Sequence, residues 1–421
     1  MEAESVTPAA NPRPDRLLPP ASGHGRITSL RVRTVGPHVL ASPWLDLDTD
    51  VTSYGRAVKN HLGFGNPHLG PLAKPATIAG LELPNRLVMA PMTRAMSPGG
   101  VPSEDVAAYY ERRAGSGIGL IITEGIYVDH PSAGHEPDVP RLVPDESAEG
   151  WRRVVARIHD AGGRVAAQLW HLGSEREAVD GVPAWTPSGV REDGSPRGWA
   201  MTHDDMREVS DAFARSAARA REVGFDAVEL HGAHGYLLDE FLWSATNRRM
   251  DEYGGVAGSR AAFPAAVVAA VREAVGPDYP IIYRFSQFKN RAYGAQVATS
   301  PDELGSLLGP LVAAGIDMLH ASTRRFWEPA FPGSTLSLAG WAKTLTGLPT
   351  ITVGSVGLAE GFLTDPHAPG SLKSLCERFE RGEFELVAVG RGLLANPDWA
   401  HKIRLGGRPV PFSEEHVARL Y

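Results

Sequence analysis

The stretch VELHGAHGYLLDEFLWSATNRRMDEYGG, residues 228–255, decides how the rest of the chain is interpreted. An apolar strand, AVEL at 227–230, runs directly into His231, His234 and Tyr236. Two imidazoles can hold a carbonyl oxygen or another oxyanion, and a phenol can deliver a proton. A strand end is a rigid place from which to aim such side chains. We therefore expect a site for a small molecule at the end of this strand.

Short runs rich in Val, Ile and Leu recur along the chain from about residue 71. They are LVMAP (87–91), GLIITEG (119–125), RVAAQLW (164–170), DAVELHG (226–232), PIIYRFS (280–286), IDMLHAS (316–322), PTITVG (349–354) and FELVAVG (384–390). Segments of helical period lie between them, at 104–114, 147–161, 205–223, 260–275, 302–314 and 372–381. Continuous apolarity is typical of parallel strands buried on both faces. Eight such strands with helices between them predict a (β/α)8 TIM barrel over residues 71–421.

A doubly wound sheet is the competing α/β fold, and it would carry a G-x-G-x-x-G turn after its first strand. The first strand is followed instead by APMTRAMSPGG, residues 90–100, which lacks that spacing. Ser103 is a predicted cap for the 104–114 helix, and Thr202 or Asp204 for the helix that ends near Gly224. The long loop 171–203 would cover the catalytic face, as a lid or a substrate wall.

Residues 1–70 differ in character from the predicted barrel. Pro, Gly and Ser interrupt the first 25 positions, and no clear helical period appears. We expect a partly disordered N-terminal extension. An alternative is that the segment is an upstream mis-start and absent from the native protein, which a peptide from residues 1–40 would refute.

Composition narrows the class of protein. Of 421 residues, 43% are hydrophobic and 22% charged, an ordinary globular balance with ample material for a core. The 42 basic and 49 acidic residues give a net charge of −7 without a basic stripe, so nucleic acid is not an expected partner. The one cysteine, Cys376, excludes an internal disulfide and a thiolate metal cluster. No secretory signal or membrane span is predicted, and a cytoplasmic location is expected.

Barrel enzymes gather their active sites at the C-terminal ends of the strands. Seven of the eight predicted strands, all but the sixth, end in chain order in Pro91-Met92-Thr93, Gly125, Gln168, His231 with His234, Arg284, Gly354-Ser355 and Gly390-Arg391. Each end has a task if the ligand is flavin mononucleotide (FMN). Each residue alone also has a plain structural explanation, so the hypothesis rests on their joint occurrence.

The tasks follow from the chemistry of the flavin. A flat ring system needs close backbone approach, which suits Gly125 and the turn 91–93. The polar pyrimidine edge suits Gln168, and the charge that the ring gains on reduction suits Arg284. Barrel loops after the seventh and eighth strands commonly bind phosphate, here at 354–355 and 390–391.

The His231-x-x-His234 pair has two rival interpretations. Zinc would require a third ligand and is usually held by HExxH on a helix, which is absent, so no metal is expected. The histidines could instead be buried and satisfied by backbone, and Tyr236 could be a half-buried core aromatic.

Seven segments resemble the motifs of the old yellow enzyme family, in the family's order over about residues 74–410. They are APMTRAMSPGG, IITEG, AAQLWHLG, ELHGAHGYLLDEFLWSATNRRMDEYGG, RFS, TVGS and VAVGRGLLANPDW. The resemblance implies bound FMN, reduced by NADPH or NADH, that delivers hydride to the β-carbon of an activated alkene, an α,β-unsaturated carbonyl or nitro compound. It implies that His231 and His234 bind the substrate oxygen, that Tyr236 protonates the α-carbon on the opposite face, and that Thr93 hydrogen-bonds the flavin O4.

Some features depart from the family or leave alternatives open. The family does not require 70 extra residues at the front. In the loop STRRFWEPAF, residues 322–331, Phe326 and Trp327 could wall the substrate pocket or pack under the loop. A redox-neutral flavin-dependent isomerase or biosynthetic flavoenzyme is the alternative function. The single cysteine argues against the iron–sulfur-linked relatives, and the intact triplet at 231, 234 and 236 argues against a flavin-binding sensor. The oligomeric state is open.

Overall fold

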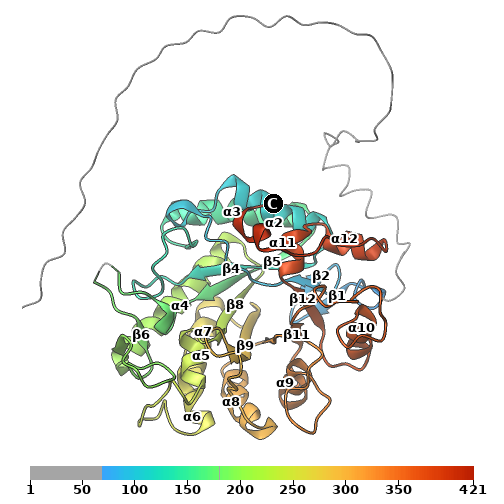
Figure 1. Cartoon of the computed structure of the whole chain (residues 1–421). Helices are drawn as coiled ribbons and strands as arrows, with labels where there is room; N and C mark the ends of the chain where they lie inside the picture. Colours follow the sequence, from blue (N-terminus) through green and yellow to red (C-terminus); the bar gives the residue numbers. More distant parts are fainter. Residues whose placement is uncertain (1–68, 180) are drawn as a thin grey trace, which may run out of the picture. The chain divides into compact units, whose positions relative to one another are not determined.

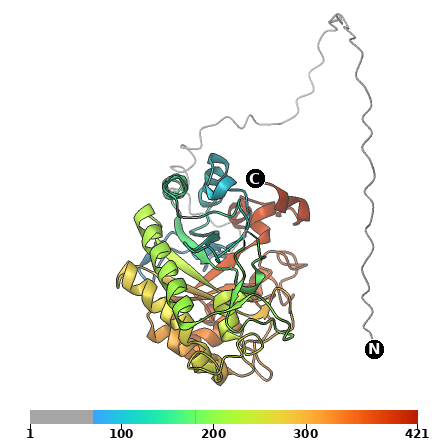
Figure 2. The same cartoon turned by 90° about the vertical axis from the view of Figure 1, so that its left-hand side faces the viewer.

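The computed structural model describes residues 69–179 and 181–421. Eight parallel strands close into a barrel, and helices surround it on the outside (Figure 1). The view turned by 90° shows the same order of layers, with strands inside and helices outside (Figure 2). The predicted (β/α)8 barrel is confirmed. The predicted N-terminal extension, residues 1–70, lies outside the described residues except for its last two positions.

Each of the eight predicted apolar runs forms one barrel strand, and neighbours in the barrel follow chain order. The strands are β3 (Leu87–Met89), β4 (Leu120–Tyr127), β5 (Arg164–Trp170), β8 (Ala227–His234), β9 (Ile281–Lys289), β10 (Met318–Ser322), β11 (Thr350–Val353) and β12 (Leu386–Val389). Strand β12 pairs with β3 and closes the barrel. Parallel pairing throughout brings the C-terminal ends of all eight strands to one end.

The longer helices lie between the barrel strands. They are α2 (Glu104–Gly115), α3 (Asp145–Asp160), α4 (His203–Val223), α7 (Ala262–Val275), α8 (Pro301–Ala313), α9 (Leu338–Thr346) and α10 (Leu372–Glu380). Shorter ones are α5 (Leu237–Leu242), α6 (Ala257–Arg260), α11 (Arg391–Ala395) and α12 (Trp399–Arg404). The six predicted segments overlap six of these seven longer helices and lack α9, and the segment 260–275 covers α7 and only the last residue of α6. In the described part of the chain, no helix is both long and apolar enough to span a bilayer.

Two of the predicted helix boundaries show the expected cap geometry. The Ser103 hydroxyl accepts a hydrogen bond from the Val106 N–H at the start of α2. At α4 the cap is Thr202 rather than Asp204, and it forms a capping box with Asp205. Gly224 ends α4 in the left-handed conformation, at φ 105°.

The barrel interior changes from apolar to polar along its axis. A core cluster separate from the main one draws on alternate residues of all eight strands, such as Leu120, Ala227 and Ile282. The hairpin β1 (Ala76–Ile78) and β2 (Leu81–Leu83) packs its apolar side chains into this cluster. Further along the strands, the same alternation places four polar side chains, Gln168, Glu229, Arg284 and His320. An apolar plug therefore supports a polar layer near the C-terminal ends.

The predicted lid or wall, residues 171–203, contains its own short elements. They are η4 (Gly173–Glu175) and a parallel pair, β6 (Trp185–Thr186) with β7 (Trp199–Ala200). Arg249 holds this loop, since its guanidinium donates to the carbonyl oxygens of Pro187 and Met201 at 2.9 and 2.5 Å. The loop is thereby attached to the chain that follows α5, and its role over the site stays a prediction.

Candidate active site

The structure brings His231, His234 and Tyr236 together at the end of β8. The ring centroids lie 5.3 Å apart for the two histidines and 4.9 Å apart for His231 and Tyr236. His234 adopts the left-handed conformation at φ 67°, which is rare for residues with a side chain and concentrates at functional sites. This residue turns the chain out of β8 toward α5, and both the His234 ring and the Tyr236 ring meet the His231 ring edge-on.

Both histidines are neutral donors at ordinary pH. Burial, and then the Arg284 cation, hold the pKa of His231 and of His234 well below the usual range. The Nε2 of His234 lies 2.8 Å from the Ser322 hydroxyl. The buried Nδ1 of His231 has no hydrogen-bond partner among the described residues. A neutral imidazole carries one N–H, so the pair can offer donors to an oxygen without carrying full charge.

Tyr236 is suited to act as an acid. Its ring packs edge-on against Trp170, with centroids 5.0 Å apart. Burial, and then the Glu175 carboxylate, raise the pKa of Tyr236 to about 12. The phenol therefore stays protonated at neutral pH. The Asn290 side-chain amide donates a hydrogen bond to its oxygen at 3.2 Å.

Arg284 is the cation of the polar layer. It pairs in register with His231 across β8 and β9, and it is 6% exposed. Its Nη2 lies 3.4 Å from the Ser322 hydroxyl, while its buried Nε has no partner in the described part of the chain. Burial lowers its pKa, and the nearby Glu229 carboxylate counteracts that shift. A buried donor is normally paired in a folded protein, so the unpaired Nε of Arg284 is available to a ligand.

Gln168 belongs to a buried chain of hydrogen bonds that the sequence interpretation missed. Its amide Nε2 donates to Glu229 at 2.8 Å, and the other Glu229 oxygen lies 2.6 Å from Nδ1 of His320. Glu229 and His320 are fully buried. The signal in the sequence was a polar residue at an inward position of an otherwise apolar strand. Because the Gln168 side-chain nitrogen donates to Glu229, the side-chain oxygen of Gln168 remains for another partner.

The turn after β3 is held by a carboxylate from the neighbouring strand. Glu124 accepts hydrogen bonds from the backbone N–H groups of Arg94 and Ala95, at 2.8 and 2.9 Å. Burial raises the pKa of Glu124 to about 7. Thr93, directly before these residues, is exposed. Glu124 therefore fixes the segment that presents Pro91, Met92 and Thr93.

Two of the predicted flavin-binding glycines are required by packing within the protein. A Cβ on Gly125 would lie 2.4 Å from the Trp170 ring, and one on Gly354 would lie 2.4 Å from the Thr323 hydroxyl. Gly390 has more room, because a Cβ there would lie 3.7 Å from the nearest atom, the sulfur of Met92. The loops after β12 and β3 are thus neighbours.

The predicted phosphate loops adjoin one another at the ends of β11 and β12. Ser355 is in the left-handed conformation at φ 51°, and its hydroxyl donates to the Arg324 carbonyl oxygen at 2.8 Å. Arg391 is exposed, and its guanidinium lies over the Phe412 ring at 5.6 Å. Phosphate binding by these loops stays a prediction.

The two aromatic residues after β10 pack under their loop. Phe326 is fully buried, and its ring meets Trp327 edge-on with centroids 5.0 Å apart. The Trp327 ring lies 2.7 Å from the position of a Cβ on Gly370. Of the two alternatives, the structure shows packing against the segment after β11.

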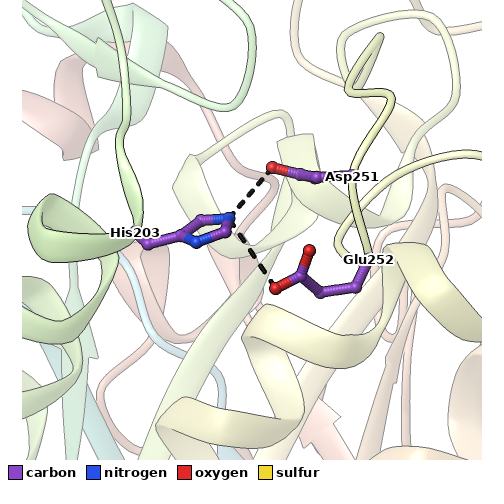
Figure 3. Close-up of side chains that lie close together, drawn as sticks. All are labelled: His203, Asp251 and Glu252. Atoms are coloured by element: carbon purple, nitrogen blue, oxygen red, sulfur yellow. Dashed lines mark hydrogen bonds and ion pairs between the residues drawn. The ribbon is translucent and has the colours of Figure 1, made fainter.

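The second half of the long central motif has a structural task. The Asp251 carboxylate accepts a hydrogen bond from Nε of Arg249 at 3.0 Å. This hydrogen bond from Arg249 lowers the pKa of Asp251 to about 2. His203 lies 3.2 Å from Asp251 and 3.8 Å from Glu252, and Figure 3 shows the three side chains facing one another. The Arg249 cation on Asp251 disfavours a metal ion here. The group ties the start of α4 to the loop after α5.

The residues at the barrel end fit FMN in chemistry and placement. Gln168 offers an amide oxygen, and Arg284 offers a buried guanidinium nitrogen without a partner in the described chain. A ligand that carries both a hydrogen-bond donor and an acceptor on a flat polar edge would complete these hydrogen bonds. The fold and this donor set are those expected of a flavin-dependent oxidoreductase.

Comparison with known proteins agrees with this class. Residues 71–408 match the model of the NADH:flavin oxidoreductase / NADH oxidase family. The chain belongs to this family, that of the old yellow enzymes, which confirms the sequence-based expectation, including FMN as cofactor and a nicotinamide nucleotide as hydride donor.

Several relatives and solved structures resemble the chain over most of the barrel. The NADH oxidase of Thermoanaerobacter brockii is 33% identical over 80% of this chain, which spans 51% of that protein. The 12-oxophytodienoate reductase 2 of Arabidopsis thaliana is 32% identical over 80% of this chain and 88% of its own length. The structure of morphinone reductase with tetrahydroNAD superposes with a TM-score of 0.71 at 29% identity, covering 84% of this chain and 94% of that one. This chain therefore spans about half the length of the NADH oxidase and most of the two reductases.

Proposed function

We propose that the protein is an ene-reductase, which reduces the carbon–carbon double bond of an α,β-unsaturated carbonyl or nitro compound. The observation that carries the proposal is the grouping of two neutral histidines, a protonated tyrosine and a buried arginine at one end of the barrel. The similarity to a 12-oxophytodienoate reductase and to morphinone reductase supports the same reaction class.

Each protein group has one task in this reaction. FMN, when bound and reduced by NADPH or NADH, supplies the hydride that adds to the β-carbon of the alkene. His231 and His234 donate hydrogen bonds to the carbonyl or nitro oxygen and stabilise the negative charge that develops there. Arg284 and Gln168 would hold the polar edge of the bound cofactor. Tyr236 transfers its hydroxyl proton to the α-carbon, and solvent then reprotonates the phenolate.

Anaerobic visible spectroscopy tests the proposal directly. NADPH should bleach the flavin band of the purified protein, and 2-cyclohexenone should restore it. A band that bleaches and stays bleached with both enones and nitroalkenes would contradict alkene reduction. Conversion of a substrate without net NADPH consumption would favour the redox-neutral isomerase instead.

A further inference from the structure

We propose that Asn290 is a positioning residue, which orients the Tyr236 hydroxyl toward the substrate and stabilises the phenolate that remains after proton transfer. The inference rests on the proposed role of Tyr236 as proton donor. Its basis is the hydrogen bond from the Asn290 amide Nδ2 to the Tyr236 oxygen at 3.2 Å. Asn290 follows the last residue of β9, and the two residues are 54 positions apart.

The chemistry of a phenol gives this hydrogen bond a direction. A phenolic oxygen has one O–H to donate and can also accept. With Asn290 donating to the oxygen, the O–H bond points away from Asn290 and is free to face the substrate. During transfer the O–H bond breaks, a C–H bond forms at the α-carbon, and the electron pair stays on the phenolic oxygen. A hydrogen bond to the resulting anion is stronger than one to the neutral phenol, so it favours the transfer.

Asn290 is held at this place by contacts to the turn that carries Tyr236. Its backbone N–H donates to the His234 carbonyl oxygen at 3.1 Å. The preceding residue, Lys289, forms an ion pair of 2.7 Å with Asp239 of α5, and the two side chains are 2% and 0% exposed. Asp239 also accepts from the Gly235 backbone N–H at 2.6 Å. The end of β9 therefore contacts the β8–α5 turn at His234, before Tyr236, and at Asp239, after it. These contacts hold Asn290 next to Tyr236.

Charged groups of both signs surround Tyr236, and the Asn290 amide is a neutral donor among them. Burial raises the pKa of Tyr236 most, and Glu175 and Glu136 raise it further, whereas the Asn290 hydrogen bond and the Arg284 cation lower it. Glu175 is itself paired with Arg291, the residue after Asn290, at 2.5 Å. Among the titratable rings of the described residues, His231 packs edge-on against Tyr236, and Tyr127 is close enough to interact with it electrostatically. Burial and the carboxylates keep the phenol protonated, and the Asn290 amide stabilises the product anion without adding a charge.

Rapid-mixing kinetics on the FMN-bound full chain tests the role in proton transfer. Asn290→Ala should leave flavin reduction by NADPH unchanged and slow reoxidation by 2-cyclohexenone about tenfold or more, the equivalent of one hydrogen bond to a charged group. Its solvent isotope effect in D2O should rise, because proton transfer becomes slower relative to hydride transfer. Asn290→Asp should reduce the reoxidation rate further, because a carboxylate accepts a hydrogen bond from the phenol and repels the phenolate. Asn290→Gln should recover part of the reoxidation rate. Gln296→Ala, an exposed amide on the same loop, is the matched control.

A second measurement needs neither substrate nor turnover. In protein labelled with 13Cζ-tyrosine, the NMR signal that disappears in Tyr236→Phe belongs to Tyr236. Asn290→Ala should move that signal and raise its pKa, because the hydrogen bond lowers it. An unmoved signal together with an unchanged isotope effect would overturn the inference. A wild-type protein that binds flavin but reduces no enone would instead overturn the proposed function, while the NMR signal would still report the hydrogen bond.

Discussion

Gln168 and Glu229 face each other across strands β5 and β8, with the amide nitrogen 2.8 Å from a carboxylate oxygen. Glu229 is fully buried, and its second oxygen is engaged by His320 at 2.6 Å. An amide in this setting cannot rotate freely, because exchange of its N and O atoms would bring two acceptors together. The carboxylate thus leaves the oxygen of the Gln168 amide free for another partner, which we propose is the cofactor.

We expect Gln168→Ala and Glu229→Gln each to weaken FMN binding about tenfold, the value of one or two hydrogen bonds. The second variant acts indirectly, because Gln168 loses the acceptor that orients it. The double variant should therefore bind FMN more tightly than the product of the two single effects predicts. FMN fluorescence on titration into the flavin-free protein measures the dissociation constants. Independent, fully additive effects would contradict the positioning of Gln168 by Glu229.

Tyr236→Phe removes the proposed acid and keeps the ring that packs on Trp170. Reduction of the flavin by NADPH should proceed at the wild-type rate, whereas reoxidation by 2-cyclohexenone should slow by about 100-fold or more, as is typical for loss of a general acid. Anaerobic rapid mixing separates the two half-reactions. Unchanged reoxidation by the enone would refute the proton-donor role.

His231→Ala should weaken the binding of phenol ligands, which resemble the enolate-like anion of the reaction. We expect about a tenfold or larger increase in the dissociation constant, from the loss of a hydrogen bond to a charged oxygen. Long-wavelength absorbance changes on phenol titration report binding. A titration curve of the variant that coincides with that of the wild type would exclude the role of this imidazole.

The same titration has a predicted pH dependence. Both histidines have a pKa well below the usual range, because the protein buries them beside Arg284. Phenol affinity should therefore show no inflection near pH 6.5, where an ordinary histidine titrates. It should change only where the phenol itself ionises. An inflection near pH 6.5 that is lost in His231→Ala would show that this histidine is charged in the site.

Glu240 should make stability fall as pH rises. One of its oxygens accepts from the Ser174 backbone N–H at 3.0 Å, and the other is buried with no partner among the described residues. Burial raises its pKa from 4.5 to about 8. The folded protein therefore holds a proton that the unfolded chain releases, so the stabilisation present below about pH 4.5 is lost as the pH rises to about 8.

Glu240→Gln cannot ionise and should remove this pH dependence. The free energy of unfolding of the wild type, relative to that of the variant, should fall by on the order of a few kcal/mol between about pH 5 and pH 8. The basis is about 1.4 kcal/mol for each unit of pKa shift. Urea unfolding at several pH values measures the difference. The exposed Glu252→Gln is the control and should track the wild type. Parallel stability curves for wild type and Glu240→Gln would contradict a buried, protonated carboxyl group.

The eight strands could be predicted because each depends on a local pattern. An apolar run such as RVAAQLW needs burial on both faces wherever it lies, and β5 has the predicted bounds, 164–170. The ends of parallel strands meet at one end of a barrel, so the grouping of His231, Arg284 and Gln168 also followed from the order of the runs. Helix α9 was missed although α10, which is equally short, was predicted, because the α9 sequence LAGWAKTLT contains Gly and two Thr residues, which are poor helix formers.

The chain's sequence alone therefore determined the barrel, the end at which its polar residues gather, and the resemblance to a flavoenzyme family. Only the tertiary structure decided which polar groups pair. Glu229 meets His320 across 91 positions, and Asn290 meets Tyr236 across 54. The packing of Phe326 under its loop was likewise undecided in the sequence. The physical reason is that strand periodicity is set by neighbours along the chain, whereas hydrogen-bond partners and pKa shifts are set by side chains that folding brings together from distant strands.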